Sequence, residues 1–274
     1  MRLHELNRIT NSFQARAKKM PIIFVGHGHP INALMDTDFS RSLTKMGQTI
    51  EKPAAILVIS AHWETVGTYV SVNAVPRTIH DFGRFDDRLY EMTYPASGHP
   101  ELAKELKGLV SLTDIMEDGG MGLDHGAWTV LNFIRPAADV PVFEMSIDFT
   151  KGPDFHYQLG QQLKLLRKKG VLIICSGNIV HNLRLSDWHH IDAVTHDWNL
   201  EFDQLVKENI DQHAFDRLVN YQQLGNAAKL AIPTNDHYLP MIYSLGIIDK
   251  DDNIKHIYEG YQYAGISMRC FQAG

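Results

Sequence analysis

Residues 21–30 read PIIFVGHGHP, an apolar run that ends in glycines with His27 and His29 set among them. Four large apolar residues between a proline and a glycine are typical of a buried β-strand, because the run is too short for a helix and rich in β-branched side chains. The two histidines therefore follow a strand directly. In open α/β sheets, ligands bind beyond the carboxyl ends of the strands. The stretch thus indicates both a fold and a place to look for chemistry.

Other segments continue the same pattern. Short, almost continuously apolar runs recur as AAILVISAH (54–62), PVFEMSI (141–147) and VLIICSG (171–177), and helical periodicity marks ELAKELKGLV (101–110) and FHYQLGQQLKLLRKKG (155–170). Alternating strands and helices indicate an α/β fold, and strands without polar alternation are typical of a sheet covered on both faces. TYVSVNAV (68–75) and YEGYQYAGISMRCF (258–271) alternate more and are expected to be edge or antiparallel strands.

We therefore predict a single α/β domain over residues 21–274, with a central mixed, largely parallel sheet flanked by helices. Residues 1–20 precede it and carry apolar side chains at helical spacing, at Leu6, Ile9, Phe13 and Ala17. This spacing predicts an amphipathic N-terminal helix that packs against the domain or a partner subunit, so a homo-oligomer is one expectation.

Composition excludes several classes of protein. With 26 Lys and Arg against 32 Asp and Glu, the formal charge is −6, and no basic run indicates nucleic-acid binding. The apolar runs are far shorter than the roughly 20 residues that span a bilayer. The leading segment lacks the apolar core of a secretory signal, so a cytoplasmic location is expected. The two cysteines form no CxxC metal motif.

Histidine is the residue type in excess, with 15 in 274 residues. His27, His62 and His181 each lie at or just past the end of a predicted strand, and His237 lies in a polar turn, PTNDHYLP, before a helical pattern. A single histidine at a strand end is more often a hydrogen-bonded loop or core residue. Four at comparable positions favour a metal site at the C-terminal ends of the strands, since neutral imidazole is the commonest protein metal ligand.

Alternative chemistries have little support in the sequence. It contains no GxSxG elbow, no HExxH zinc motif and no phosphate-binding GxxxxGK[ST] loop. Cys175 lies in an apolar strand, where a reactive thiolate would be hard to stabilise. His80, in TIHDFGRF, is a candidate pocket residue.

Seven motifs in order resemble one family of enzymes. They are GHGHP (26–30), SAHWE (60–64), TIHDFGRF (78–85), YPASGHPELA (94–103), GLDHGAW (122–128), SGNIVHNL (176–183) and PTNDHYLP (233–240). Together they resemble the class III extradiol ring-cleavage dioxygenases, in the branch of the DOPA 4,5-dioxygenases. The resemblance runs from about residue 20 to the C-terminus.

The resemblance implies a ligand set of His27, His62, His181 and His237 around non-haem Fe(II), or Zn(II) in the same site. It also implies that His125, in GLDHG, contacts the substrate, here an aromatic diol that reacts with O2. The catalytic candidates are His181, as a general base as well as a candidate ligand, and His125, which is expected to steady the oxygen intermediate. The family usually has serine where this chain has His29, so His29 is a further candidate for the substrate pocket.

Two carboxylates deserve the same consideration. Glu64 and Asp236 lie close in sequence to candidate ligands and are expected either to bind the metal or to accept a hydrogen bond that fixes a histidine tautomer. The expected activity is extradiol cleavage of a catechol, DOPA-like or related, to a ring-opened semialdehyde. Two alternatives stay open at this point: a Zn(II) hydrolase on the same scaffold, because a site made only of histidines suits zinc, and a protein that binds ligands without catalysis.

Overall fold

The computed structural model describes residues 19–274. The expected N-terminal helix lies outside the described residues except for Lys19 and Met20, which are not helical. Within residues 19–274, no helix is both long and apolar enough to cross a membrane.

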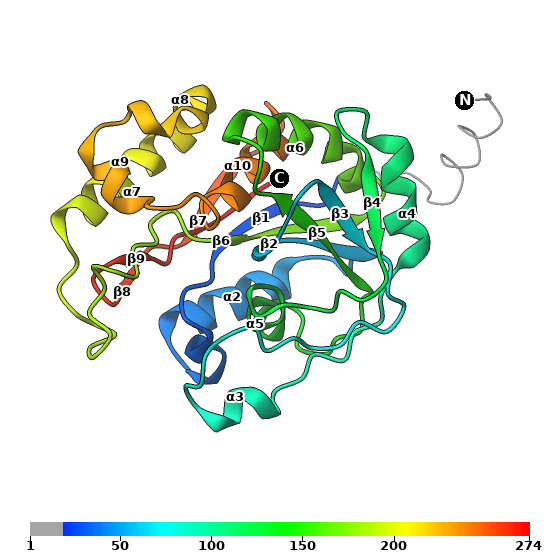
Figure 1. The fold of residues 1–274 in the computed structure, drawn as a ribbon, viewed down its shortest axis with the longest axis horizontal. Coiled ribbons are helices and arrows are strands. Elements are labelled where there is room, and N and C mark those ends of the chain that lie inside the picture. Colours follow the sequence, from blue (N-terminus) through cyan, green and yellow to red (C-terminus); the bar gives the residue numbers. More distant parts are fainter. Residues whose placement is uncertain (1–18) are drawn as a thin grey trace.

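An eight-stranded mixed sheet forms the centre of the domain (Figure 1). Its strands are β1 (Ile22–Gly26), β2 (Ala55–Thr65), β3 (Thr68–Ser71), β4 (Ile115–Asp118), β5 (Val142–Asp148), β6 (Val171–Gly177), β7 (Ile254–Tyr258) and β10 (Cys270–Ala273). They are arranged in the order β4-β3-β5-β2-β6-β1-β10-β7. A separate hairpin pairs β8 (Tyr261–Gln262) with β9 (Ile266–Ser267).

The parallel strands are the ones that the apolar runs predicted. β5, β2, β6 and β1 are neighbours and run parallel. The flanking strands include antiparallel pairs, β3 with β5 and β10 with β1. The prediction of a mixed, largely parallel sheet with antiparallel strands toward its edges is therefore confirmed.

Alternate residues of each central strand enter different cores. In β1, Ile22 and Phe24 pack into one apolar cluster while Ile23 and Val25 pack into the other. Successive side chains of a strand point to opposite faces, so a strand with apolar residues at every position must be covered on both sides. This is why the sequence shows runs rather than alternation.

Helices supply the two outer layers. On one face lie α4 (Pro100–Leu109), α6 (Pro153–Lys168) and α10 (Leu239–Ile247), and on the other lie α2 (Asp38–Thr49) and α5 (His125–Ile134). Figure 1 shows α6 and α10 above the sheet and α2 and α5 below it. The helices expected within 101–110 and 155–170 are confirmed as α4 and α6.

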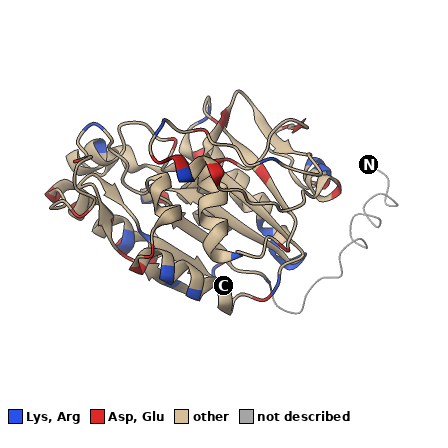
Figure 2. Cartoon of the chain, turned by 90° about the horizontal axis from the view of Figure 1, so that it is seen from below, with Lys and Arg blue, Asp and Glu red and all other residues tan. Residues whose placement is uncertain are grey.

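Shorter elements surround these layers. They are η1 (Pro30–Leu34), α3 (Asp87–Glu91), α7 (Asp197–Asp211), α8 (Phe215–Val219), η2 (Tyr221–Gln223) and α9 (Asn226–Ala231). In Figure 1, α7, α8 and α9 form a group beside the sheet, near the β8–β9 hairpin. Figure 2 shows acidic and basic residues interspersed along the outer helices and loops.

Candidate metal and catalytic site

Imidazoles from separate strands meet in one cavity at the carboxyl edge of the parallel sheet. His27 follows β1, His62 lies near the end of β2 and His181 follows β6. The cavity measures about 280 Å³. It is lined by His27, Gly28, His29, Pro30, His62, Phe82, Phe85, His125, His181, Leu183, Trp188, His237 and Ile266. The four predicted metal ligands therefore face one shared space, together with His125.

His27 is held in a single tautomer by its neighbours. Its Nδ1 lies 3.0 Å from Ser176 Oγ, and that hydroxyl donates its own proton to Gly126 O at 2.6 Å. Ser176 Oγ must therefore accept a hydrogen bond from His27 Nδ1–H, and this tautomer leaves a lone pair on Nε2. The turn that presents His27 continues through Gly28, whose φ of +62° is a conformation that glycine adopts without strain.

His62 meets His27 at an irregularity in β2. The pairing of β2 with β5 shifts register between Ile59 and Glu64, and His62 lies within that interruption. Bulges of this kind re-aim side chains near active sites. The two Nε2 atoms of His27 and His62 are 3.0 Å apart. Two nitrogens bound at ~2.1 Å to one metal ion, at angles between octahedral and tetrahedral, lie roughly 3.0–3.4 Å apart, so the pair fits a shared ion.

His181 and His237 form the opposite side of the cluster. Their rings are stacked, with centroids 3.5 Å apart and an interplanar angle of 11°. Asp236 Oδ2 accepts a hydrogen bond from His237 Nδ1, which directs Nε2 of His237 away from Asp236. The loop carrying His237 packs directly on Gly177, where any Cβ would lie 2.2 Å from His237 O, so only glycine permits this approach.

The ligand atoms fall into two groups. Nitrogens of His27, His62 and His125 lie within 4.8 Å of one another, and so do ligand atoms of His181, Asp236 and His237. The His237 ring connects the groups, with its centroid 5.3 Å from that of His27 and 4.9 Å from that of His62. The donor set is thus made mostly of imidazoles, with one carboxylate beside it.

Burial keeps His27, His62 and His181 neutral. Loss of solvent lowers the pKa of His27, His62 and His181 well below the usual value, and the neighbouring imidazoles lower each pKa further. Only the neutral ring offers a lone pair to a metal. In tautomer, spacing and charge, the cluster therefore fits a divalent metal ion.

His125 is oriented by Asp81, a residue that the sequence analysis did not select. His125 is the first residue of α5, and its backbone N donates to Asp81 Oδ1 at 2.9 Å while its Nδ1 lies 3.0 Å from Asp81 Oδ2. Burial raises the pKa of Asp81, but the hydrogen bonds from His125 outweigh it and hold the pKa below its usual value. Asp81 thus stays ionised beside Nδ1 of His125, whose ring lines the cavity.

A second pair of carboxyl groups lies behind His125. Asp124 caps the start of α5 by accepting from Ala127 N, and it also accepts from Ser60 Oγ at 2.7 Å. Burial raises the pKa of Asp124, and burial followed by the charge of Asp124 raises the pKa of Glu144 well above normal. Protonated Glu144 can therefore donate to Asp124 while its Oε1 accepts from Asp124 N at 3.0 Å.

Each of these three acids had some signal in the sequence. Asp81 adjoins His80 in TIHDFGRF, and Asp124 precedes the helical pattern where an N-cap is expected. Glu144 is the one charged residue inside the apolar run PVFEMSI, which is unusual for a strand covered on both faces. None of the three, however, could be assigned to His125 without the fold.

The remaining pocket candidates lie in different places. His29 lines the cavity. Asp236 does not line the cavity and instead contacts His237. Glu64 is exposed and also lies outside the lining. Partial loss of solvent, and then the charge of Asp236, raise the pKa of Glu64. His80 does not line the cavity either: its Nε2 lies 3.0 Å from Met92 O and its ring packs near Trp128. The structure therefore brings His29 and Asp236 to the cluster and leaves His80 and Glu64 outside the cavity lining.

Comparison with known proteins decides the family. The model described as "Catalytic LigB subunit of aromatic ring-opening dioxygenase" matches residues 21–270. The chain belongs to the LigB family. This membership makes it an enzyme, an extradiol aromatic ring-opening dioxygenase that depends on a metal, as the motifs predicted.

Relatives of this LigB protein span nearly its whole length. A protein of Escherichia coli (strain K12) named "4,5-DOPA dioxygenase extradiol" is 41% identical over 93% of this chain and 95% of its own. A protein of Beta vulgaris with the same name is 34% identical, covering 87% and 90%. The crystal structure of an uncharacterized E. coli K12 protein matches with a TM-score of 0.81 and 38% identity, covering 93% of this chain and 100% of that chain. None of these relatives favours the Zn(II) hydrolase alternative.

Proposed function

We propose that this LigB protein uses Fe(II) to cleave the ring of a catechol with O2, giving a ring-opened semialdehyde that contains both atoms of the O2 molecule. The observation that carries the proposal is the convergence of His27, His62, His181 and His237 on one cavity with His125. We assign the first four as metal ligands. A bound ferrous ion would supply open coordination positions and one-electron chemistry.

His125 is the proton-transfer group in this proposal. Its Nδ1 is held by Asp81, so its Nε2 is free to take a proton from a diol hydroxyl in the cavity. The carboxylate of Asp81 would stabilise the resulting imidazolium, which is the arrangement that a general base requires. His181, which is stacked on His237, then serves as a metal ligand.

The proposed substrate class comes from the relatives and from the cavity. Several relatives are named 4,5-DOPA dioxygenases, so DOPA and related catechols are the diols to test first. The lining combines imidazoles with Phe82, Phe85, Leu183, Trp188 and Ile266. Apolar walls of this kind accommodate an aromatic ring and exclude water from the reacting diol.

Loading the protein with either metal tests the proposal. Metal-free protein is reconstituted anaerobically with Fe(II) or with Zn(II), mixed with catechol, 4-methylcatechol or DOPA, and exposed to O2. We expect O2 uptake and a yellow semialdehyde product only with Fe(II). No O2 uptake with any diol would contradict the proposal, and turnover that follows Zn(II) and ignores O2 would support a hydrolase instead.

A pair of variants tests the ligand assignment. His27→Ala should lose at least roughly 100-fold in turnover and most of its Fe(II), because a ligand matters more than its outer partners. His213→Asn changes an exposed histidine at the end of α7 and should keep both. Full turnover and full iron content in His27→Ala would overturn the assignment.

A further inference from the structure

We propose that the mouth of the cavity is a subsite for the ring substituent of the diol and that it selects apolar substituents over anionic ones. This inference rests on the proposed function, because it takes the diol itself to lie against the imidazoles. It concerns a set of side chains that we call the aromatic mouth: His29, Phe85, Trp188 and Tyr263.

The four rings of the aromatic mouth pack on one another. The His29 ring centroid lies 4.3 Å from that of Phe85, 6.0 Å from that of Trp188 and 5.9 Å from that of Tyr263. The rings of Trp188 and Tyr263 are 5.1 Å apart. His29, Phe85 and Trp188 also line the cavity that holds the five imidazoles. The mouth is therefore continuous with the site where the diol reacts.

Large apolar side chains at this mouth are exposed to solvent. Phe85 is 55% exposed, Trp188 45% and Leu183, beside them in the cavity lining, 44%. Clustered exposed apolar residues mark a binding surface, since a folded chain otherwise covers them. A substituent that projects from the diol toward solvent would cover these three side chains.

Charge is absent from the lining. Of the residues that line the cavity in the described chain, none is Lys, Arg, Asp or Glu. Arg84 pairs with Asp87 at 3.4 Å, and exposed Arg184 does not line the cavity. A carboxylate in the mouth would find no cation there and would meet the negative faces of aromatic rings.

His29 gives the mouth a donor that is fixed in place, while Trp188 Nε1 already donates to Leu183 O at 3.1 Å. His29 Nδ1 accepts from Ile31 N at 3.1 Å, so the ring proton of the neutral imidazole is on Nε2. One N–H can serve a neutral acceptor, but it cannot replace the hydration that a carboxylate loses on leaving water. The mouth therefore discriminates by apolar contact rather than by charge.

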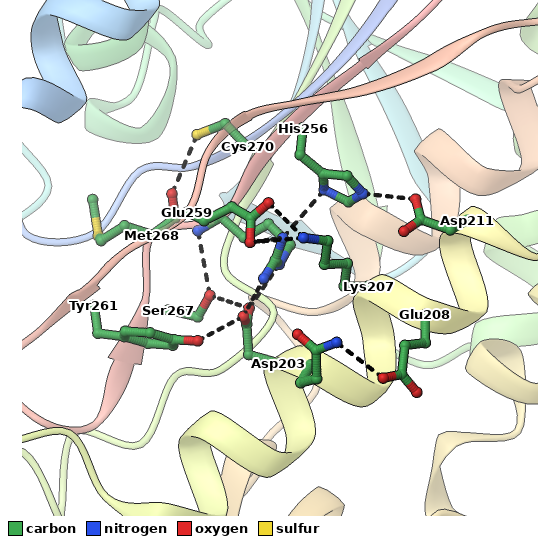
Figure 3. A network of polar contacts seen from close by, with 12 residues as sticks. Asp203, Lys207, Glu208, Asp211, His256, Glu259, Tyr261, Ser267, Met268 and Cys270 are labelled. Atoms are coloured by element: carbon green, nitrogen blue, oxygen red, sulfur yellow. Dashed lines mark hydrogen bonds and ion pairs between the residues drawn. The ribbon is translucent and has the colours of Figure 1, made fainter.

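The mouth is also held in a defined shape. Tyr263 and Ala264, in the turn between β8 and β9, have φ values of 51° and 59°, which residues other than glycine adopt at a cost. Tyr263 N donates to Ile191 O, and Tyr263 O accepts from Asp187 N, next to Trp188. Figure 3 shows the network that anchors the hairpin, in which Tyr261 and Ser267 both donate to Asp203.

Two diols that differ only in charge test the proposal. 4-Propylcatechol and 3-(3,4-dihydroxyphenyl)propanoate have side chains of the same length, and only the second ends in a carboxylate. With the Fe(II) protein, we expect kcat/KM to be roughly 10-fold higher for 4-propylcatechol, the scale of apolar discrimination in pockets. Anaerobic calorimetric titration of the Zn(II)-loaded protein should give the same order of Kd.

Single variants test whether the side chains of the aromatic mouth contact the substituent. Trp188→Ala and Phe85→Ala should each lower kcat/KM for 4-propylcatechol roughly 10-fold more than they lower kcat/KM for unsubstituted catechol. Leu165→Ala, which removes an exposed apolar side chain on α6, should change neither. Equal losses for both diols in Trp188→Ala would overturn the proposal.

Other outcomes are equally decisive. A preference for the carboxylate, lost in Arg184→Ala, would overturn the inference and assign the substituent to Arg184. Equal kcat/KM for 4-propylcatechol and 3-(3,4-dihydroxyphenyl)propanoate would also overturn the inference. Absence of O2 uptake with every one of these diols would contradict the proposed function itself, whereas O2 uptake with the wrong preference contradicts only this inference.

Discussion

Asp81 shows how much depends on one residue at this site. It contacts His125 twice, through the backbone N and through Nδ1, and lies 3.8 Å from His62 Nδ1. Its neighbour His80 turns the other way, toward Met92 O. Both belong to the motif TIHDFGRF, in which the sequence analysis favours His80 as the pocket residue because imidazole is a common ligand and proton-transfer group. The structure instead gives the carboxylate the contact with His125, which lines the cavity.

We predict that Asp81→Asn lowers kcat roughly 10- to 100-fold, as loss of an orienting partner of a histidine does. The amide keeps the bond to His125 N but offers an N–H or a neutral oxygen to Nδ1, so the ring loses its fixed tautomer and its counter-charge. Steady-state kinetics with catechol, alongside iron content, measures this. Asp87→Asn on α3 is the control, since Asp87 is 77% exposed. Unchanged kcat in Asp81→Asn would remove Asp81 from the mechanism.

At the scale of elements, the β8–β9 hairpin is joined to α7 by a buried ion pair. Arg269 donates to Asp203 through Nε at 3.0 Å and Nη2 at 2.5 Å, and both side chains are at most 2% exposed. Strand β9 also forms a bridge to His181 through Ile266. The network in Figure 3 therefore anchors the hairpin whose Ile266 lines the cavity.

Removing one partner of this pair should be costly. Arg269→Met leaves Asp203 buried without its counter-charge, and we expect the free energy of unfolding in urea at pH 7 to fall by about 3–5 kcal/mol. Arg269→Met combined with Asp203→Asn should recover part of that loss, because the remaining amide is neutral. Lys207→Ala, which removes the more exposed pair with Glu259, should cost only about 0–1 kcal/mol. Equal losses in all three variants would contradict a special role for burial.

Across the whole molecule, a second buried pair connects distant parts of the chain. Arg167 near the end of α6 donates to both carboxylate oxygens of Asp252 and to Met20 O, which precedes β1. Lys19 also lies 2.8 Å from Asp252 Oδ1. The acidic group Asp249, Asp251 and Asp252 resembles a metal site in composition, but Lys19 contacts all three carboxylates. We read it as a structural ion cluster.

This cluster predicts part of the acid sensitivity of the fold. Burial raises the pKa of Asp252, but hydrogen bonds from Arg167 and Lys19 outweigh it and hold the pKa below 3.8. A lowered pKa stabilises the folded state above the unfolded value of 3.8, and this stabilisation is lost as pH falls through the folded pKa. The free energy of unfolding should therefore decline as pH falls below about 4.

Asp252→Asn tests this at the same scale. The variant leaves Arg167 buried without its main counter-charge, so unfolding at pH 7 should be easier by about 3–5 kcal/mol. The difference from the natural protein should shrink as pH falls below about 4, because the carboxylate is protonated there first in the unfolded state and at lower pH in the folded state. Urea unfolding at a series of pH values measures it, with exposed Asp251→Asn as control. A difference independent of pH would contradict the assignment.

The sequence by itself determined the α/β class, the positions of the buried strands and the family. Local patterns suffice for these, because a strand covered on both faces must be apolar throughout. His27 and His62 come at the carboxyl ends of two such strands, so their place at the edge of the sheet can be predicted as well. The fold alone decided which side chains meet: Asp81 and His125 are 44 residues apart, and Asp203 and Arg269 are 66 apart. Those contacts depend on how strands and helices pack, so no local periodicity encodes them. The aromatic mouth is of the same kind, since His29, Phe85, Trp188 and Tyr263 come from four loops that only the folded chain brings together.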